Sequence, residues 1–304
     1  MYSDSQLTSL LDSETLKYLQ KKNRGGGANQ NGNTYENFFA IHQIALFAPL
    51  VIESGEEIYF FSQIIAFVDD LIVDLGKESA LQHFQLKNSP TVSWGSDNST
   101  GNIAYDFRKQ RHLNTEAKSR DSELFLVVSS EETQTKLQDL IPSDLADCTC
   151  VVFFPFRSTI DEFLQTHADF RQAIIYLTAF ENPSRDKIEC VAKVLLGAWV
   201  ASNTKYIAVM DVLTSAQQCQ PSFIRSFLPD HEISIDPEVS AILEQIVGFH
   251  FSLSRGFLHW EYTDDGWSTD GTFPHSYESD EFQRLQSRIK QVAPSTFEDL
   301  EALL

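Results

Sequence analysis

Two aspartates inside an apolar strand pattern constrain the fold of this chain more than any other feature. The stretch FVDDLIVDL at residues 67–75 places Asp69 and Asp70 among side chains typical of a buried strand. The turn sequence GKES follows, and residues 81–87, LQHFQLK, alternate between apolar and polar side chains. This order predicts a β-hairpin. By propensity alone, ESALQHFQL is also compatible with a short helix.

A hairpin of these two segments would gather polar side chains at one end of a sheet. Gln85 and Lys87 are two residues apart and share a face, and one register places Asp70 beside them. Carboxylate and amide oxygens are hard ligands suited to Mg²⁺ or Mn²⁺. A lysine can orient or deprotonate an attacking water, or stabilise the charge on a phosphorane. Glu36, in the first turn of a helix expected from residue 34, could add a further ligand, so these residues predict metal-dependent phosphodiester hydrolysis.

Simpler explanations exist for the same residues. Burying a carboxylate without a partner costs several kcal/mol, and an Asp–Lys ion pair would offset that cost as well as a metal would. Two aspartates at a strand end are also ordinary turn chemistry. Glu36 could simply favour the helix dipole. His83 has the same parity as Gln85 and Lys87, so it is an accessory candidate for the lining of the site.

The arrangement Glu36 … Asp70 … Gln85-Leu86-Lys87 resembles the PD-(D/E)xK nuclease superfamily, in the variant with Gln at the acidic position of the last element. The segments GGGANQNGNTYENFFA, FVDDLIV and FQLKNS resemble the nuclease domain of CBASS (CD-NTase-associated) effector endonucleases. Related domains occur in Lamassu-type anti-phage complexes. The resemblance covers about residues 25–210.

The resemblance implies a restriction-endonuclease-like fold, with a central mixed sheet flanked by helices. It implies that Glu36, Asp70 and Gln85 hold Mg²⁺ or Mn²⁺ and that Lys87 assists the attacking water. Alignment on the superfamily's D-x-x-V/A pattern selects Asp70, which leaves Asp69 on the other face or at the edge of the site. The implied activity is cleavage of double-stranded DNA during phage infection.

The order of the expected elements divides the chain into three parts. Residues 1–29 are expected to form one helix, over 5–22, and a Gly-rich linker that begins at RGGGANQNGN. Residues 30–157 combine helices with short strands and form the α/β nuclease core. Residues 158–304 are mostly helical, with a strand possible near residue 250, and form a regulatory or assembly region.

The charge is distributed unevenly along the chain. The formal net charge is -20, and residues 121–304 hold 29 Asp/Glu against 12 Lys/Arg. This argues against non-specific coating of nucleic acid. A basic cluster, Arg108, Lys109 and Arg111, supplies candidate phosphate contacts, although such a cluster is equally often a solvated face. The acidic part is expected to bind a regulator, or to repel DNA until subunits rearrange.

Other signals place the chain in a broad class. The four cysteines fit no disulfide or zinc spacing, so buried, reduced thiols are expected. No signal peptide and no apolar run of membrane-spanning length is recognised, so we expect a cytoplasmic protein that does not contact a membrane.

These observations converge on a Mg²⁺-dependent DNA endonuclease that acts as effector of a prokaryotic anti-phage system. Because a single site cuts one strand, the active form is expected to be a homo-oligomer. The part beyond residue 210 is short for a nucleotide sensor, so control is expected from another subunit, such as an SMC-like ATPase. The alternative is a catalytically inactive nuclease-like scaffold within a defence complex.

Overall fold

The computed structural model describes residues 2–29, 34–89, 91–95, 100–219 and 223–304, without the side chains of residues 4, 23–29 and 230. The chain divides into two compact units. The first unit is Met1–Arg171 with Leu195–Leu213, and the second is Gln172–Val194 with Thr214–Leu304. The first unit therefore reaches beyond residue 157, because later segments complete its sheet.

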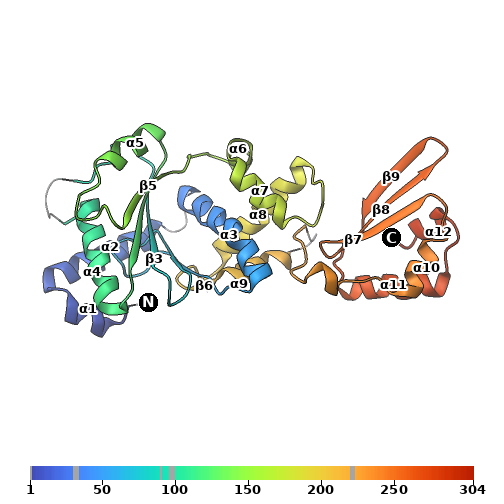
Figure 1. The fold of residues 1–304 in the computed structure, drawn as a ribbon, viewed down its shortest axis with the longest axis horizontal. Coiled ribbons are helices and arrows are strands. Elements are labelled where there is room, and N and C mark those ends of the chain that lie inside the picture. Colours follow the sequence, from blue (N-terminus) through green and yellow to red (C-terminus); the bar gives the residue numbers. More distant parts are fainter. Residues whose placement is uncertain (1, 30–33, 90, 96–99, 220–222) are drawn as a thin grey trace. The chain divides into compact units, whose positions relative to one another are not determined.

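The first unit contains most of the α/β structure (Figure 1). Its elements are α1 (Asp4–Leu10), α2 (Ser13–Asn29), α3 (Thr34–Ser54), β1 (Tyr59–Phe61), β2 (Leu71–Asp74), β3 (Leu81–Lys87), α4 (Ile103–Lys118), β4 (Ser122–Val128), α5 (Glu131–Asp139), β5 (Thr149–Phe153), α6 (Ile160–Thr166) and β6 (Ile207–Ala208). Three helices have residues in both units: α7 (Ala168–Leu177), α8 (Arg185–Ala201) and α9 (Val209–Gln217).

The strands of the first unit form one mixed sheet, in the order β5-β4-β3-β2-β1-β6. The pairs β3–β4 and β4–β5 are parallel, and the pairs among β1, β2, β3 and β6 are antiparallel. This confirms the α/β class with a mixed sheet flanked by helices. The hairpin is confirmed too, since Leu71 pairs with Phe84 and Asp74 with Leu81, which excludes a helix over residues 81–87.

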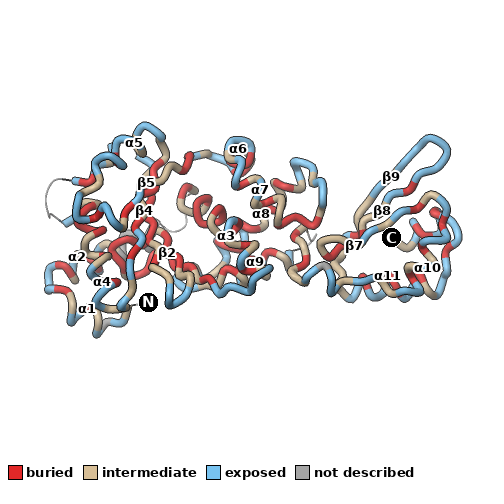
Figure 2. The backbone as a smooth tube through the Cα atoms, in the orientation of Figure 1, coloured by how far each residue is buried: buried red, intermediate tan, exposed pale blue. Residues whose placement is uncertain are grey.

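Helix α3 is the principal core helix of the first unit. Ile41, Ile44, Ala45 and Ala48 are fully buried along it, and Figure 2 shows buried residues along much of its length. Among the described residues, α3 is the one helix long and apolar enough to cross a membrane. Half of its most apolar window is buried inside the structure, as in the core helix of a soluble protein, so this is weak evidence for a membrane span.

The N-terminal part differs from the expected single helix and linker. Two helices form, because Leu11 adopts an extended conformation and the Asp12 carboxylate then accepts hydrogen bonds from the backbone N–H groups of Glu14 and Thr15. The backbone of α2 continues to Asn29, so the glycines at 25–27 lie in a helix. Glycine costs a helix about 1 kcal/mol relative to alanine and does not prohibit it. The rest of the expected linker, 30–33, lies outside the described residues.

The second unit combines helices with a three-stranded antiparallel sheet. Its remaining elements are the 3₁₀ helix η1 (Asp230–Glu232), α10 (Pro237–Leu243), β7 (Phe249–Ser254), β8 (Phe257–Asp264), β9 (Trp267–Thr272), α11 (Asp280–Val292) and α12 (Phe297–Glu301). The sheet order is β7-β8-β9, and side chains of β7 and β8 pack with those of α10, α11 and α12 in one core. The C-terminal part thus combines several helices with a three-stranded meander, of which a strand near residue 250 was expected.

The cysteines are free thiols, as expected, but they are not all buried. Cys150 and Cys219 are exposed, and Cys148 and Cys190 are half-buried. The expectation of burial was wrong because the spacing of cysteines says nothing about the exposure of the elements that carry them. Cys150, for example, points outward from β5, whose burial alternates along the strand.

Candidate functional site

Glu36 and Asp70 line the same cavity of about 200 Å³. Glu36 lies in the first turn of α3, and Asp70 immediately precedes β2. The Nε2 atom of Gln63 donates to Glu36 Oε2 over 3.2 Å. The remaining wall comes largely from residues 199–205, which include Trp199, Ser202, Asn203, Thr204 and Lys205. Two carboxylates that are 34 residues apart in the sequence therefore open into one polar cavity.

The backbone that carries the two aspartates is held by the residues that follow β1. The hydroxyl of Ser62 donates to the carbonyl of Asp70 over 2.9 Å, and the N–H of Gln63 donates to the carbonyl of Asp69 over 2.8 Å. Gln63 adopts a left-handed conformation with φ 53°, which is uncommon for a residue other than glycine. This turn orients Gln63 toward Glu36 while its backbone fixes the position of Asp69.

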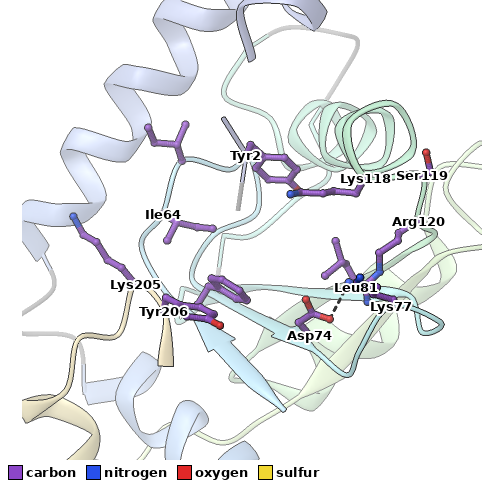
Figure 3. A pocket seen from close by; sticks show the side chains of 12 residues that line it. Tyr2, Ile64, Asp74, Lys77, Leu81, Lys118, Ser119, Arg120, Lys205 and Tyr206 are labelled. Carbon is purple, nitrogen blue, oxygen red and sulfur yellow. Dashed lines mark hydrogen bonds and ion pairs between the residues drawn. The ribbon is translucent and has the colours of Figure 1, made fainter. Parts of the chain in front are cut away.

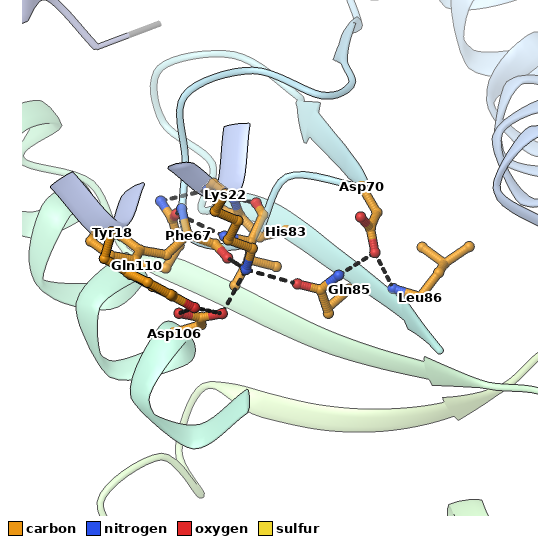
Figure 4. Close-up of polar contacts among 10 residues, drawn as sticks. Tyr18, Lys22, Phe67, Asp70, His83, Gln85, Leu86, Asp106 and Gln110 are labelled. Atoms are coloured by element: carbon orange, nitrogen blue, oxygen red, sulfur yellow. Dashed lines mark hydrogen bonds and ion pairs between the residues drawn. The ribbon is translucent and has the colours of Figure 1, made fainter. Parts of the chain in front are cut away.

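Asp70 also contacts the neighbouring strand (Figure 4). Its Oδ2 atom accepts a hydrogen bond from the backbone N–H of Leu86, at 2.7 Å, and another from Nε2 of Gln85. The register Leu71↔Phe84 places Asp70 opposite Gln85 when it is extended by one residue. The structure therefore brings together three of the expected site residues, Glu36, Asp70 and Gln85.

The other end of the Gln85 side chain meets a residue that was not expected at the site. Lys22, on α2, donates from Nζ to Gln85 Oε1 at 3.4 Å, to the carbonyl of Phe67, and to Asp106 Oδ2 at 2.6 Å (Figure 4). Asp106 is 6% exposed, in the first turn of α4, and also accepts from Tyr18. Burial raises the pKa of Asp106, and the positive charge of Lys22 opposes that rise.

Asp69 and Lys87 belong to this second group of charges. Asp69 is 3% exposed, and its burial, with the negative charge of Asp70 beside it, raises its pKa to about 7. The positive charge of Lys87, which is half-buried at the end of β3, lowers the pKa values of both Asp69 and Asp106. Lys87 is absent from the described lining of the Glu36–Asp70 cavity.

His83 is a buried structural residue rather than part of the cavity lining. Its Nδ1 atom lies 2.9 Å from the carbonyl of Val68, and its Nε2 atom lies 3.1 Å from Asn114 Nδ2. Since the amide of Asn114 donates there, Nε2 accepts and Nδ1 carries the proton. Burial lowers the pKa of His83 to about 4. Parity alone could not show this, because β3 lies inside the sheet with both faces covered.

The basic cluster expected to contact DNA is largely engaged with other residues. Arg108 binds Asp144 through two hydrogen bonds, of 2.6 and 3.0 Å, and Arg111 binds Asp147 at 2.6 Å. Lys109 lies over the ring of Tyr105, 5.6 Å from its centre. These side chains would have to leave their partners, or share them, to contact a phosphate.

A second cavity, of about 820 Å³, is lined by basic side chains that lie far apart in the sequence (Figure 3). Lys77, Lys118, Arg120 and Lys205 line it, from the β2–β3 turn, the end of α4, the residues after α4, and the loop before β6. Arg120 is fixed by Asp74, at 2.8 Å, and by backbone carbonyls. Lys205 lines both cavities. No local pattern in the sequence indicates this group, because its members are up to 128 residues apart.

The donor atoms of the smaller cavity fit a hard divalent cation in part. Among the described residues, no group of three or more His, Cys, Asp or Glu is placed to hold a metal. Mg²⁺, however, usually keeps several waters and takes only one or two carboxylates from the protein. Glu36 and Asp70 supply those carboxylates, whereas Gln85 turns an N–H group, rather than its oxygen, toward Asp70.

Comparison of the chain with protein-family models, curated proteins and solved structures finds no significant match.

Proposed function

We propose that this chain is a metal-dependent DNA endonuclease with a restriction-endonuclease-like core. One observation carries the proposal: Glu36 and Asp70 open into one cavity, and Asp70 is held by Gln85 across the hairpin. The resemblance to PD-(D/E)xK nucleases also implies that Glu36, Asp70 and Gln85 meet, but it implies that the oxygen of Gln85, rather than its N–H group, faces the metal. The mixed sheet is compatible with it, because β3 carries Gln85 and Lys87 between an antiparallel and a parallel neighbour.

The proposed roles follow from the contacts of each side chain. Glu36 and Asp70 would hold Mg²⁺ or Mn²⁺, which supplies charge stabilisation for the scissile phosphate and acidifies a bound water. Gln63 orients Glu36, and the N–H of Leu86 orients Asp70. Lys87, at the end of β3, does not line this cavity, so its proposed role in orienting the attacking water rests on the resemblance alone.

Double-stranded DNA is the proposed substrate, and the basic cavity supports this choice. Its lysines come from three separate elements, and Lys205 also borders the carboxylate cavity. Such contacts position a phosphate backbone without reading its sequence. We place the endonuclease in a cytoplasmic anti-phage system on the strength of the resemblance. A sensor subunit, such as an SMC-like ATPase, would control it, and two copies would cut the two strands.

Plasmid cleavage with Mg²⁺ or Mn²⁺ at low salt tests the proposal. We expect the wild type to cut, and Asp70→Asn and Lys87→Ala to lose at least about a hundredfold in rate, as is typical for such catalytic groups. Asp139→Asn and Lys136→Ala change the same charges at exposed positions of α5 and should cut normally. If Asp70→Asn cuts as fast as the wild type, the site is wrongly assigned.

The alternative is a catalytically inactive scaffold, which the net charge of -20 favours because an acidic protein repels DNA. The ion pairs of Arg108 and Arg111 with aspartates also favour the scaffold, because they engage side chains that were expected to contact DNA. Mn²⁺ binding separates the two candidates. A scaffold should show no Mn²⁺ site that Asp70→Asn removes, whether or not a partner subunit is present.

A further inference from the structure

The two ends of the Gln85 side chain have partners of opposite kinds. Nε2 donates to the carboxylate of Asp70, and Oε1 accepts from the ammonium of Lys22. An ammonium has only hydrogen-bond donors and a carboxylate only acceptors, so these partners allow one orientation of the amide. The opposite orientation would place N–H groups against Lys22 and an oxygen against Asp70.

This orientation turns the metal-binding atom of Gln85 away from the proposed metal site. Only the amide oxygen can bind a cation, and it faces Lys22 rather than Asp70. If Gln85 and Asp70 are to share an ion, the amide must turn over and both hydrogen bonds must break. Lys22 is itself a cation at that oxygen, so a second cation there would meet like-charge repulsion.

Lys22 is held in place by two further acceptors. Asp106 lies 2.6 Å from its ammonium, and the carbonyl of Phe67 accepts a third hydrogen bond. The Lys22 side chain is 21% exposed and that of Asp106 is 8% exposed, so the pair is largely shielded from water. Lys21, the next residue on α2, is exposed. The contact is therefore specific to one lysine of the helix.

We propose that Lys22 is a latch on the metal site, which holds Gln85 in an orientation that cannot bind metal until α2 shifts. The inference rests on the proposed function and names a regulation of that site. Metal binding by Gln85 and docking of Lys22 on Gln85 exclude each other. A partner or substrate that draws α2 away from β3 thereby raises the affinity of the site for its metal.

Mn²⁺ binding, measured by the electron paramagnetic resonance signal of free Mn²⁺, tests the latch without any cleavage assay. We expect Lys22→Met to bind Mn²⁺ about tenfold more tightly than the wild type, because hydrogen bonds to a charged group no longer oppose the turn of the amide. Lys21→Met removes the same charge from an exposed position and should bind like the wild type. Equal affinities for all three proteins would overturn the latch.

The proposal requires that the gain in Mn²⁺ affinity of Lys22→Met depends on Gln85. In the double variant Lys22→Met/Gln85→Leu we expect the affinity of Gln85→Leu alone, because no amide oxygen remains to be released. A tenfold gain that persists in this background would mean that Lys22 acts by charge alone, and the proposal would fail.

Lys22→Met leaves Asp106 buried without its cation, which can destabilise the fold. The pair Asp106→Asn and Asp106→Asn/Lys22→Met avoids this, and thermal melting checks that both are folded. The double variant should bind Mn²⁺ more tightly than Asp106→Asn. If no protein has an Mn²⁺ site that Asp70→Asn removes, the proposed function fails together with the latch. If Asp106→Asn and Asp106→Asn/Lys22→Met bind Mn²⁺ equally at a site that depends on Asp70, the latch is disproved and the proposed function stands.

Discussion

His42 is a buried residue whose two ring nitrogens have no hydrogen-bond partner in the described part of the protein. It is 8% exposed, on α3, and lies among the rings of Phe154, Phe170 and His167. A buried polar group without a partner costs about 1–3 kcal/mol. The ring of His42 therefore stabilises the fold by packing, whereas its two unpaired nitrogens lower the free energy of unfolding.

Replacing His42 with an apolar residue should stabilise the protein. We expect His42→Leu to raise the free energy of unfolding by about 1 kcal/mol, since the penalty of the unpaired nitrogens exceeds the small change in packing. Urea unfolding at pH 7.5 measures this. His112→Leu, at an exposed position of α4, is the control and should change the free energy of unfolding little. A loss of stability in His42→Leu would show that its nitrogens have partners in solution.

The same residue should make the fold sensitive to acid. Burial, with a smaller effect of His167, lowers the pKa of His42 to about 3, from 6.5. Below pH 6.5, His42 therefore binds a proton in the unfolded chain but not in the folded protein. Stability should fall from pH 6.5 toward pH 3, with a slope of up to about 1.4 kcal/mol per pH unit. His83, whose pKa is about 4, adds a similar slope over a shorter range.

Urea unfolding from pH 7 to pH 5 checks the acid sensitivity. His42→Leu should show the shallower dependence, since it removes one of the histidines whose pKa burial lowers, while His83, His167 and His259 remain. Identical slopes for the two proteins would assign the acid sensitivity elsewhere.

At the scale of the element, two hairpin turns of the second unit give a matched test. Gly256 and Gly266 occupy equivalent positions in the β7–β8 and β8–β9 turns, with φ of 84° and 94°. A Cβ atom at Gly256 would lie 2.2 Å from the Cβ of Ser226, whereas nothing lies within 4 Å at Gly266. Backbone strain is thus shared, and the steric clash is confined to one turn.

We expect Gly256→Ala to destabilise the protein clearly more than Gly266→Ala. The latter carries only the strain of a left-handed alanine, about 1–2 kcal/mol, and the former adds displacement of the Ser226 segment. Thermal melting of both variants gives the comparison. Equal decreases in melting temperature would mean that the Ser226 segment moves aside at little energetic cost.

The elements that sequence analysis predicted well are those with local signals. The β2–β3 hairpin follows from alternation and a turn, and α3 follows from helical spacing. The β8–β9 hairpin has the Asp-Gly signal at residues 265–266, which is typical of two-residue hairpin turns. The expectation of a mostly helical part over residues 158–304 did not use this turn signal.

The candidate site was predictable where local patterns or the resemblance named its residues, as for Glu36, Asp70 and Gln85. Asp70 and Gln85 meet through a hairpin whose register the pattern indicates. Lys22 reaches Gln85 from a helix 63 residues away, and no periodicity in the sequence carries that contact. For the same reason the lysines of the basic cavity could not be grouped in advance.

At the scale of the whole molecule, DNA binding should depend strongly on salt. Residues 230–304 hold fifteen Asp/Glu and four Lys/Arg, so the acid of the chain is concentrated away from the lysines of the basic cavity in sequence. We expect Lys205→Ala to weaken DNA binding and to reduce the slope of log K against log salt by about 1. Lys193→Ala, at a lysine paired with Glu189, should leave the slope unchanged.

Fluorescence anisotropy of a labelled duplex between 50 and 200 mM salt, roughly the range over which such contacts are lost, measures this slope. A Lys205→Ala slope equal to that of the wild type, together with a reduced slope in Arg111→Ala, would move the DNA contact to the α4 surface.

The pairing of β6 with β1 has a consequence for synthesis on the ribosome. Phe60 pairs with Ile207, so this edge of β1 has no partner strand until almost 150 further residues have been synthesised. At about 5–20 residues per second, that interval lasts roughly 7–30 s. Residues 199–205, which wall the Glu36–Asp70 cavity, emerge in the same interval. Under the proposed function, the cavity around Glu36 and Asp70 is complete only once residue 205 has been translated.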